Sequence, residues 1–177
     1  MFSSSPEYCV SLQQVADPEA SRGERAAMPL DPRPARPDDL YTIEDIVRCA
    51  YSPYVSRIGR APGPMLDDYG ALILDGRVHV VERDGAIQGI LVLIPEKDAM
   101  LLDNVAVAPS AQGSGLGRRM LEYAEQSARQ AGYRFIKLYT NEAMTENIGL
   151  YTRIGYSETH RADEKGLKRV YMVKTLA

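Results

Sequence analysis

Residues 101–118 read LLDNVAVAPSAQGSGLGR, and this stretch decides the fold. Its first part, up to Ala108, is apolar along most of its length, which predicts a strand buried on both faces of a sheet. A turn containing Gly113, Gly115 and Gly117 follows. After the turn, apolar side chains recur at the spacing of a helix that buries one side, and Gly132 is its predicted end. We therefore predict a strand, a glycine-rich turn and a helix in direct succession.

A glycine-rich turn at the start of a helix is suited to binding phosphate groups. The first N–H groups of a helix have no partner within it, and its dipole adds partial positive charge. Glycine lets phosphate oxygens approach the backbone without meeting a Cβ atom. The dinucleotide fingerprint fails, because its third glycine falls on Arg118, and the Gly-Lys-Ser/Thr of a P-loop is absent. The remaining pattern is Gln-x-x-Gly-x-Gly, formed by Gln112, Gly115 and Gly117.

The chain before the glycine turn is predicted to hold two helices and three strands, with at most an edge strand ahead of them. Prolines restrict residues 32–37 to an edge strand, and Asp38 or Asp39 is expected to cap a helix that Pro53 ends. Residues 51–64 are predicted to be a loop, and a second helix is expected over residues 64–74. Asp84-Gly85 predicts a hairpin turn. The strands expected here span residues 78–83, 86–94 and 99–108.

The segment after the unit is predicted to contain a strand, a helix and a final hairpin. Their expected ranges are residues 135–140, 145–154, 156–161 and 167–174, with the hairpin turn at residues 163–166. Two helices come first, an antiparallel meander follows, and the later helices are interleaved with strands without a repeating βαβ order. The fold class is therefore a mixed α/β sandwich of the α+β type.

Two motifs together resemble the GNAT superfamily of N-acetyltransferases. The first is the strand-to-helix stretch ending QGSGLGR at residues 112–118, and the second is NIGLY at residues 147–151, with Gly155-Tyr156 after it. The resemblance covers roughly residues 30–174. It implies a mostly antiparallel central sheet with helices on both faces, in which two splayed neighbouring strands bind acetyl-CoA as co-substrate, with no metal.

The resemblance also implies which residues hold acetyl-CoA. Backbone groups of the strand at Val105, Ala106 and Val107 are expected along the pantetheine arm, in the manner of an added strand. The backbone N–H groups of the turn are expected to hold the pyrophosphate; they belong to Gln112, Gly113, Ser114, Gly115, Leu116, Gly117 and Arg118. Many family members carry an asparagine seven residues before the tyrosine, where this chain has Met144. Asn147 and Asn141 are the nearest substitutes.

Tyr151 is the residue that the resemblance assigns to protonation of the leaving thiolate. A phenol has a pKa near 10, so it stays protonated at neutral pH and can act as a general acid. Asp103 is expected on the same strand face as Val105 and Val107, either as a base for the amine or as a structural carboxylate. His79 and Glu142 are more simply explained as a strand histidine and a solvated loop carboxylate.

The acceptor side is predicted to be walled by the early helices and their loop. Tyr54, Arg57 and Tyr69 lie in that segment, where aromatic and guanidinium groups suit a polar pocket; surface packing is the alternative. Asn141 is added as a further substrate contact at the end of its predicted strand. The hypothesis is acetyl transfer by direct attack of a primary amine. A non-catalytic acyl-CoA sensor on the same fold, and transfer of a longer acyl chain, are the alternatives.

Composition restricts the other classes of function. The chain has 177 residues, 45% of them apolar and 25% charged, and a net charge of −3, which argues against a nucleic-acid binder. Cys9 and Cys49 form no metal or disulfide motif. No apolar run is long enough to cross a bilayer and no secretory signal is visible. We expect a cytoplasmic monomer or homodimer with no nucleic-acid or membrane partner.

The first 28 residues differ from the rest because Ser, Pro, Arg and Glu dominate them. They are predicted to form a weakly ordered extension, followed by a single domain over residues 29–177. A short helix across residues 12–16 that packs on the domain is the alternative.

Overall fold

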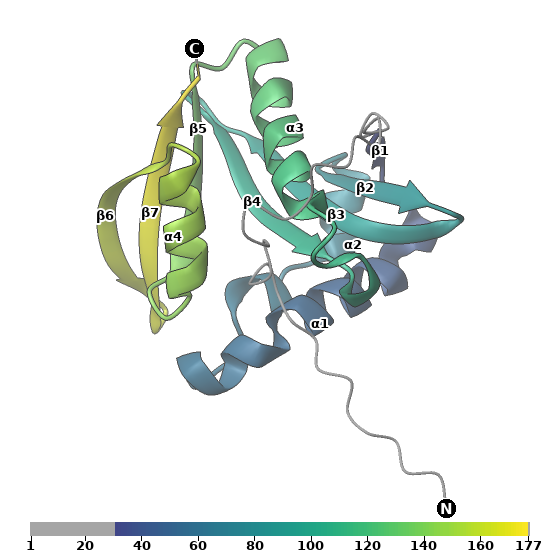
Figure 1. The fold of residues 1–177 in the computed structure, drawn as a ribbon, viewed down its shortest axis with the longest axis horizontal. Coiled ribbons are helices and arrows are strands. Elements are labelled where there is room, and N and C mark those ends of the chain that lie inside the picture. Colours follow the sequence, from purple (N-terminus) through teal and green to yellow (C-terminus); the bar gives the residue numbers. More distant parts are fainter. Residues whose placement is uncertain (1–30, 177) are drawn as a thin grey trace, which may run out of the picture.

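The computed structural model describes residues 31–176, and these form a seven-stranded sheet with helices on both faces (Figure 1). The strand order is β1-β2-β3-β4-β5-β7-β6, and every neighbouring pair is antiparallel except β4 and β5. The predicted mostly antiparallel sheet is confirmed. The prediction about residues 1–28 lies outside the described residues.

The first half of the described chain builds one side of the sheet and the two helices that cover it. Its elements are β1 (Arg33–Pro34), η1 (Pro37–Asp39), α1 (Leu40–Ile58), η2 (Gly63–Met65), α2 (Tyr69–Leu74), β2 (Val78–Arg83), β3 (Ala86–Pro95) and β4 (Met100–Val107). The Asp84-Gly85 turn is as predicted, with both residues at positive φ. Side chains of α1 and α2 pack with one face of β2, β3 and β4 to form one apolar cluster.

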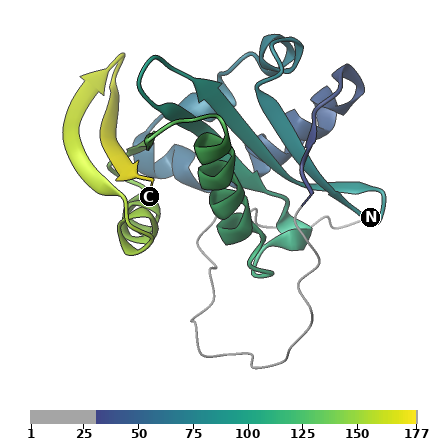
Figure 2. The same cartoon turned by 90° about the horizontal axis from the view of Figure 1, so that it is seen from above.

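The second half builds the other side and covers the opposite face. Its elements are η3 (Pro109–Ala111), α3 (Leu116–Gln130), β5 (Phe135–Asn141), α4 (Thr145–Arg153), β6 (Ser157–Glu164) and β7 (Leu167–Thr175). α3 and α4 contribute to a second apolar cluster with β3, β4, β5 and β7. Figure 2 shows α3 and α1 on opposite sides of the strands. The hairpin turn between β6 and β7 is shorter than the predicted residues 163–166. Strand β6 continues to Glu164, and within the turn only Lys165 and Gly166 have positive φ.

Helix α1 differs from the prediction because it continues through Pro53 to Ile58. Proline removes one helical hydrogen bond, yet the residue after it, Tyr54, is completely buried and keeps the last turn packed on the domain. The hydroxyl of Ser52 also donates to the Arg48 carbonyl at 2.5 Å, a back-bond typical of bent helices. The predicted loop over residues 51–64 therefore begins only at Gly59, which has φ of +79°.

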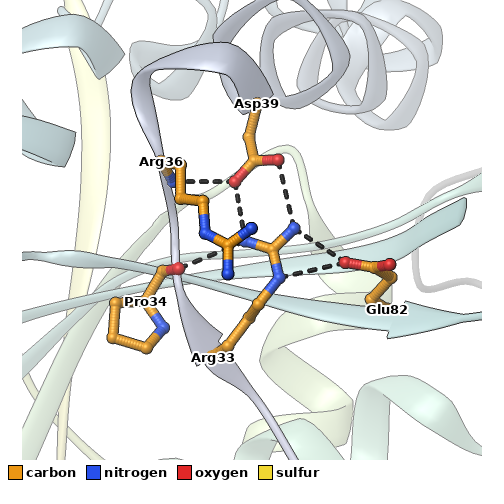
Figure 3. Close-up of polar contacts among 5 residues, drawn as sticks. All are labelled: Arg33, Pro34, Arg36, Asp39 and Glu82. Atoms are coloured by element: carbon orange, nitrogen blue, oxygen red, sulfur yellow. Dashed lines mark hydrogen bonds and ion pairs between the residues drawn. The ribbon is translucent and has the colours of Figure 1, made fainter. Parts of the chain in front are cut away.

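The start of α1 is held by a charged cluster rather than by a side-chain cap (Figure 3). The Asp39 carboxylate accepts from the Arg36 backbone N–H at 2.7 Å and from the Arg33 guanidinium at 2.7 Å. Arg33 also pairs with Glu82 of β2 at 2.8 Å. The hydrogen bond from Arg33 is the main reason that the pKa of Asp39 lies below its usual value. These hydrogen bonds and ion pairs connect edge strand β1 to β2 and to the start of α1.

Helix α2 also starts later than predicted. Residues 63–65 form the separate short helix η2, and the Asp68 carboxylate then caps α2 by accepting from the Ala71 N–H at 2.9 Å.

The parallel pair β4 and β5 is the feature that positions the site. The two strands are paired only at Met100–Ile136 and Leu101–Lys137, near their starts. Beyond these residues they diverge, as Figure 1 shows, so that the carboxyl halves of both strands border a gap. A break of this kind leaves backbone groups in the middle of a sheet without strand partners.

Candidate active site

A cleft that is open to solvent lies where β4 and β5 diverge. Residues of β4, β5 and β7 line it, together with residues of α4 and a wall made by α1 and η2. Its lining residues include Asp103, Val105, Asn141, Asn147 and Tyr151, five of the residues predicted from sequence. The two halves of the chain therefore meet at this cleft.

The backbone of β4 offers polar groups to the gap. The Ala108 N–H donates to the Gln88 carbonyl of β3 at 2.8 Å, so Ala108 faces β3. Backbone groups alternate sides along an antiparallel strand, which turns those of Val107 and Val105 away from β3 and toward β5. The Gln112 side-chain amide reaches the Val107 carbonyl at 3.4 Å. This arrangement fits the expected pairing with an extended pantetheine arm. Ala106, expected on the same arm, instead faces β3, and its side chain packs in the α1 cluster.

The glycine turn is open in the way that phosphate binding needs. Gly113 and Gly115 have φ of +75° and +77°, and a Cβ atom added at either would meet no atom within 4 Å. The N–H groups of Leu116, Gly117 and Arg118 belong to the first turn of α3 and have no intrahelical acceptor. The turn therefore presents backbone donors on an unobstructed surface, and it fits a pyrophosphate.

Two of the predicted turn amides already have acceptors within the turn. The Gln112 N–H reaches the Pro109 carbonyl at 3.3 Å, and the Ser114 N–H reaches the Ala111 carbonyl at 3.4 Å. Side chains contribute little, because Leu116 is buried in the core and Arg118 points outward to pair with Glu122.

Asp103 occupies a β-bulge, which corrects its predicted direction. Asn104 pairs with Val92 and Leu102 pairs with Leu93, so Asp103 is the extra residue on β4. Its carboxylate accepts from the Tyr139 hydroxyl at 2.7 Å. The bulge breaks the simple alternation along β4, and for this reason Asp103 does not share the α3-facing side of Val105 and Val107.

Tyr151 lies on α4 and is 8% exposed, with its ring edge-on to Tyr156 at 5.8 Å between centroids. Burial raises its pKa, and neighbouring Tyr54 adds to the rise. Tyr151 therefore remains a neutral phenol at physiological pH and holds a proton at the cleft. This is the state that a general acid requires.

The amide side chains beside Tyr151 are engaged with Met144 and with the backbone. Asn147 is buried and its amide contacts the Met144 sulfur at 3.8 Å. Asn141 accepts from the Ala143 N–H at 3.0 Å, so it holds the turn that leads into α4. Met144 itself is 4% exposed and lines the cleft, which narrows the space beside Tyr151.

Three acceptor-side predictions lie away from the cleft lining. Tyr54 is completely buried, and the Arg57 guanidinium lies over its ring at 5.5 Å. Arg57 pairs with Glu146 of α4 at 2.7 Å. Tyr69 is buried and donates to the Pro64 carbonyl at 2.9 Å. The reason is the longer α1, which carries Tyr54 into the core and Arg57 beyond the cleft.

Sequence reasoning missed several residues that the fold brings to the cleft. Tyr139 and Arg169 come from β5 and β7, and the guanidinium of Arg169 stacks on the Tyr139 ring at 4.2 Å. Arg169 also pairs with Glu164 at 2.8 Å. Asn104 is buried next to the bulge. Only Asn104 carried a signal in the sequence, because it and Asp103 are the polar residues of an otherwise apolar strand.

Comparisons with known proteins agree with this geometry. The family profile described as "Acetyltransferase (GNAT) domain" matches residues 74–158. Aminoalkylphosphonate N-acetyltransferase of Salmonella typhimurium is 29% identical over 109 residues, which cover 57% of this chain and 71% of that protein. Across five curated relatives the matched stretch spans 40% to 71% of the relative's length.

Solved structures share the fold. The paia N-acetyltransferase of Thermoplasma acidophilum, in complex with coenzyme A, has a TM-score of 0.66 at 16% identity and covers 84% of this chain and 99% of its own. A GNAT family acetyltransferase of Elizabethkingia anophelis with acetyl-CoA bound has a TM-score of 0.51 at 20% identity, over 63% and 87% of the two chains.

The splayed strands, the open glycine turn and the profile match define an acetyl-CoA-dependent N-acetyltransferase domain. Together with the named N-acetyltransferases and the solved GNAT structures, this match supports a GNAT N-acetyltransferase. In the part of the chain that the structure describes, no helix is long and apolar enough to cross a membrane.

Proposed function

We propose that this protein acetylates the primary amine of a small acceptor by direct attack on acetyl-CoA, within the cleft between β4 and β5. The observation that carries the proposal is that a protonated phenol, Tyr151, and a carboxylate, Asp103, line one cleft at the point where the strands diverge. The turn that fits a pyrophosphate begins at the end of the same β4 strand.

Each residue has a defined task in this proposal. Acetyl-CoA supplies an acetyl group on a thioester. Asp103 takes a proton from the attacking nitrogen as the C–N bond forms, directly or through water. Tyr151 gives its proton to the sulfur as the C–S bond breaks. Solvent then removes the proton from Asp103 and restores that of Tyr151. The β4 backbone at Val105 orients the thioester and can polarise its carbonyl.

The acceptor is proposed to approach the cleft from the wall made by α1 and η2. Two contacts join this wall to the second half of the molecule: Arg57 pairs with Glu146, and Arg60 donates to the Lys165 carbonyl at 2.6 Å. These contacts narrow the route to the cleft, which favours a small acceptor over a residue in a folded protein.

The test is an acceptor screen that follows release of the free CoA thiol. The purified protein is incubated with acetyl-CoA and a panel of primary amines, amino acids, aminoalkylphosphonates and peptides. We expect at least one small amine to be acetylated, with loss of turnover in Tyr151→Phe. Tight binding of acetyl-CoA by calorimetry with no turnover across the panel would contradict the proposal and favour a sensor.

A further inference from the structure

Asn104 is the centre of a buried hydrogen-bond chain that connects β4 with both covering helices. The Tyr51 hydroxyl of α1 donates to Asn104 Oδ1 at 2.6 Å, and Asn104 Nδ2 donates to the Tyr69 hydroxyl of α2 at 2.8 Å. Tyr69 in turn donates to the Pro64 carbonyl at 2.9 Å. Asn104 and Tyr69 are 2% and 3% exposed. We call these four groups the Asn104 relay.

The direction of the relay is fixed by its last member. The Pro64 carbonyl can only accept, so Tyr69 must donate its one proton there and can only accept from Asn104. Asn104 therefore turns its NH₂ group to Tyr69 and its oxygen to Tyr51. Tyr51 must then donate to that oxygen. Burial raises the pKa of Tyr51, which keeps this phenol neutral and keeps its proton in the relay.

This direction determines what Tyr51 presents to the cleft that it lines. Because its proton is committed to Asn104, its oxygen has only lone pairs left to offer. Asp103 is in a similar state, since its carboxylate already accepts from Tyr139 and ionised carboxylates only accept. The bulge side of β4 therefore offers two hydrogen-bond acceptors, one from each residue.

We infer that Tyr51, held by the Asn104 relay, is a specificity-determining residue that selects primary over secondary amines. A neutral primary amine has two N–H groups, one for Asp103 and one for the Tyr51 oxygen, and keeps its lone pair for the acetyl carbon. An N-methyl amine has one N–H and leaves one acceptor without a partner. The inference rests on the proposed acetyl transfer to a primary amine and adds the residue that selects this class of amine.

The test compares a primary amine from the acceptor screen with its N-methyl derivative. In the unmodified protein we expect the primary amine to have a KM at least about tenfold lower, the scale of one hydrogen bond to a buried group. Tyr51→Phe should raise the KM of the primary amine about tenfold, leave that of the N-methyl amine within about twofold, and so remove most of the preference. Any steric part of the preference that comes from the ring remains, because phenylalanine keeps the ring and removes only the hydroxyl.

Tyr41→Phe is the matched control, because Tyr41 lies on the same helix and is 80% exposed. It should leave both KM values unchanged. The affinity for acetyl-CoA, measured by calorimetry, should stay within about twofold in both variants. A primary-amine preference that survives intact in folded Tyr51→Phe would overturn the inference.

A double-mutant cycle tests whether Tyr69 acts through Tyr51. Tyr69→Phe removes the hydroxyl that fixes Asn104 and should raise the KM of the primary amine about threefold to tenfold in the unmodified background. In the Tyr51→Phe background it should have almost no further effect. Equal effects in both backgrounds would show that Tyr69 is merely structural and would overturn the relay.

The outcomes separate this inference from the proposed function. Failure of every amine to turn over in the unmodified protein refutes the acetyl transfer itself. Turnover with an unchanged ratio of the two KM values in Tyr51→Phe refutes only the role of Tyr51.

Discussion

The two ends of the candidate site are built in different ways. The pyrophosphate end consists of consecutive residues at the start of α3, and it offers backbone N–H groups on an open surface. The acceptor end is assembled from α1, η2, β4, β5 and β7, and it offers side chains held by one another. The pyrophosphate end depends on the backbone conformation of one short segment. The acceptor end depends on which side chains the fold places next to one another. Substitutions at the two ends should therefore fail in different ways.

Tyr151 lies between the two ends, and its substitution should have the largest effect on turnover. Tyr151→Phe keeps the buried ring and removes only the proton, so kcat should fall about 100-fold while the affinities for acetyl-CoA and acceptor change little. Steady-state kinetics and calorimetry measure both. Tyr156→Phe is the control, because the Tyr156 ring contacts Tyr151 but its buried hydroxyl has no hydrogen-bond partner among the described residues. A kcat of Tyr151→Phe within twofold of the unmodified value assigns the proton to another donor.

The pyrophosphate end is tested by two glycines of the same backbone type. Gly115 and Gly132 lie at the start and just beyond the end of α3, with φ of +77° and +85°, and a Cβ atom at either meets nothing within 4 Å. Replacement by alanine should cost about 1–2 kcal/mol of stability in both, because L-residues are strained there. Only Gly115→Ala places a methyl group at the proposed phosphate surface.

We expect Gly115→Ala to weaken acetyl-CoA binding by about tenfold or more, and Gly132→Ala to leave it unchanged. Calorimetry on the folded variants measures the difference. Similar affinities in the two variants would mean that the turn does not bind the cofactor, and the contrast between the two ends would lose its basis.

Substitutions at the edge of the acceptor end should change the acceptor KM only weakly. Arg57 lies outside the cleft lining but joins α1 to α4 through Glu146, and both side chains are about 40% exposed. Arg57→Ala should raise the acceptor KM only about twofold to fivefold, because solvent screens an exposed ion pair and it contributes little. Arg48→Ala is the control, since Arg48 pairs with Asp45 within the same helix. A lower affinity for acetyl-CoA in Arg57→Ala would reverse the assignment of the two ends.

The same contrast explains how much was predictable from the sequence. The strand, turn and helix around Gly115 were predicted closely, because local residue types dictate strand burial, positive φ and helix starts. The direction of Asp103 was wrong because a bulge depends on the register of β4 against β3. The last turn of α1 was missed because burial of Tyr54 outweighs Pro53.

The acceptor end depends most on pairing between strands that are far apart in the sequence. Tyr139 and Arg169 stand 30 positions apart, and only the β5–β7 register brings Arg169 opposite Asn141, two residues from Tyr139. No pattern within one segment indicates such a contact. The side chains proposed to hold the acceptor could therefore not be found from spacing, whereas the backbone turn could.

The smallest expected effect concerns the charge of Asp67, which lies in the segment between η2 and α2. Burial by surrounding atoms, and then the nearby Asp103 carboxylate, raise the pKa of Asp67 from 3.8 to about 6. The folded protein therefore holds this proton more tightly than the unfolded chain does. Stability consequently falls as the pH rises from about 4 to about 6, and the loss persists at higher pH. Below pH 4 the group is protonated in both states and costs nothing.

Asp67→Asn should therefore raise the midpoint of thermal unfolding at pH 8 but not at pH 4. The side chain is more than a third exposed, so solvent screens the charge and the gain should be about 1 kcal/mol or less, or roughly 2–4 °C. Asp98→Asn, in the exposed turn between β3 and β4, is the control and should show no such pH dependence. Thermal scans at the two pH values decide the matter. A rise of the same size in the unfolding midpoint at pH 4 cannot come from a carboxylate charge. It would show that the charge of Asp67 does not lower the stability of the folded protein.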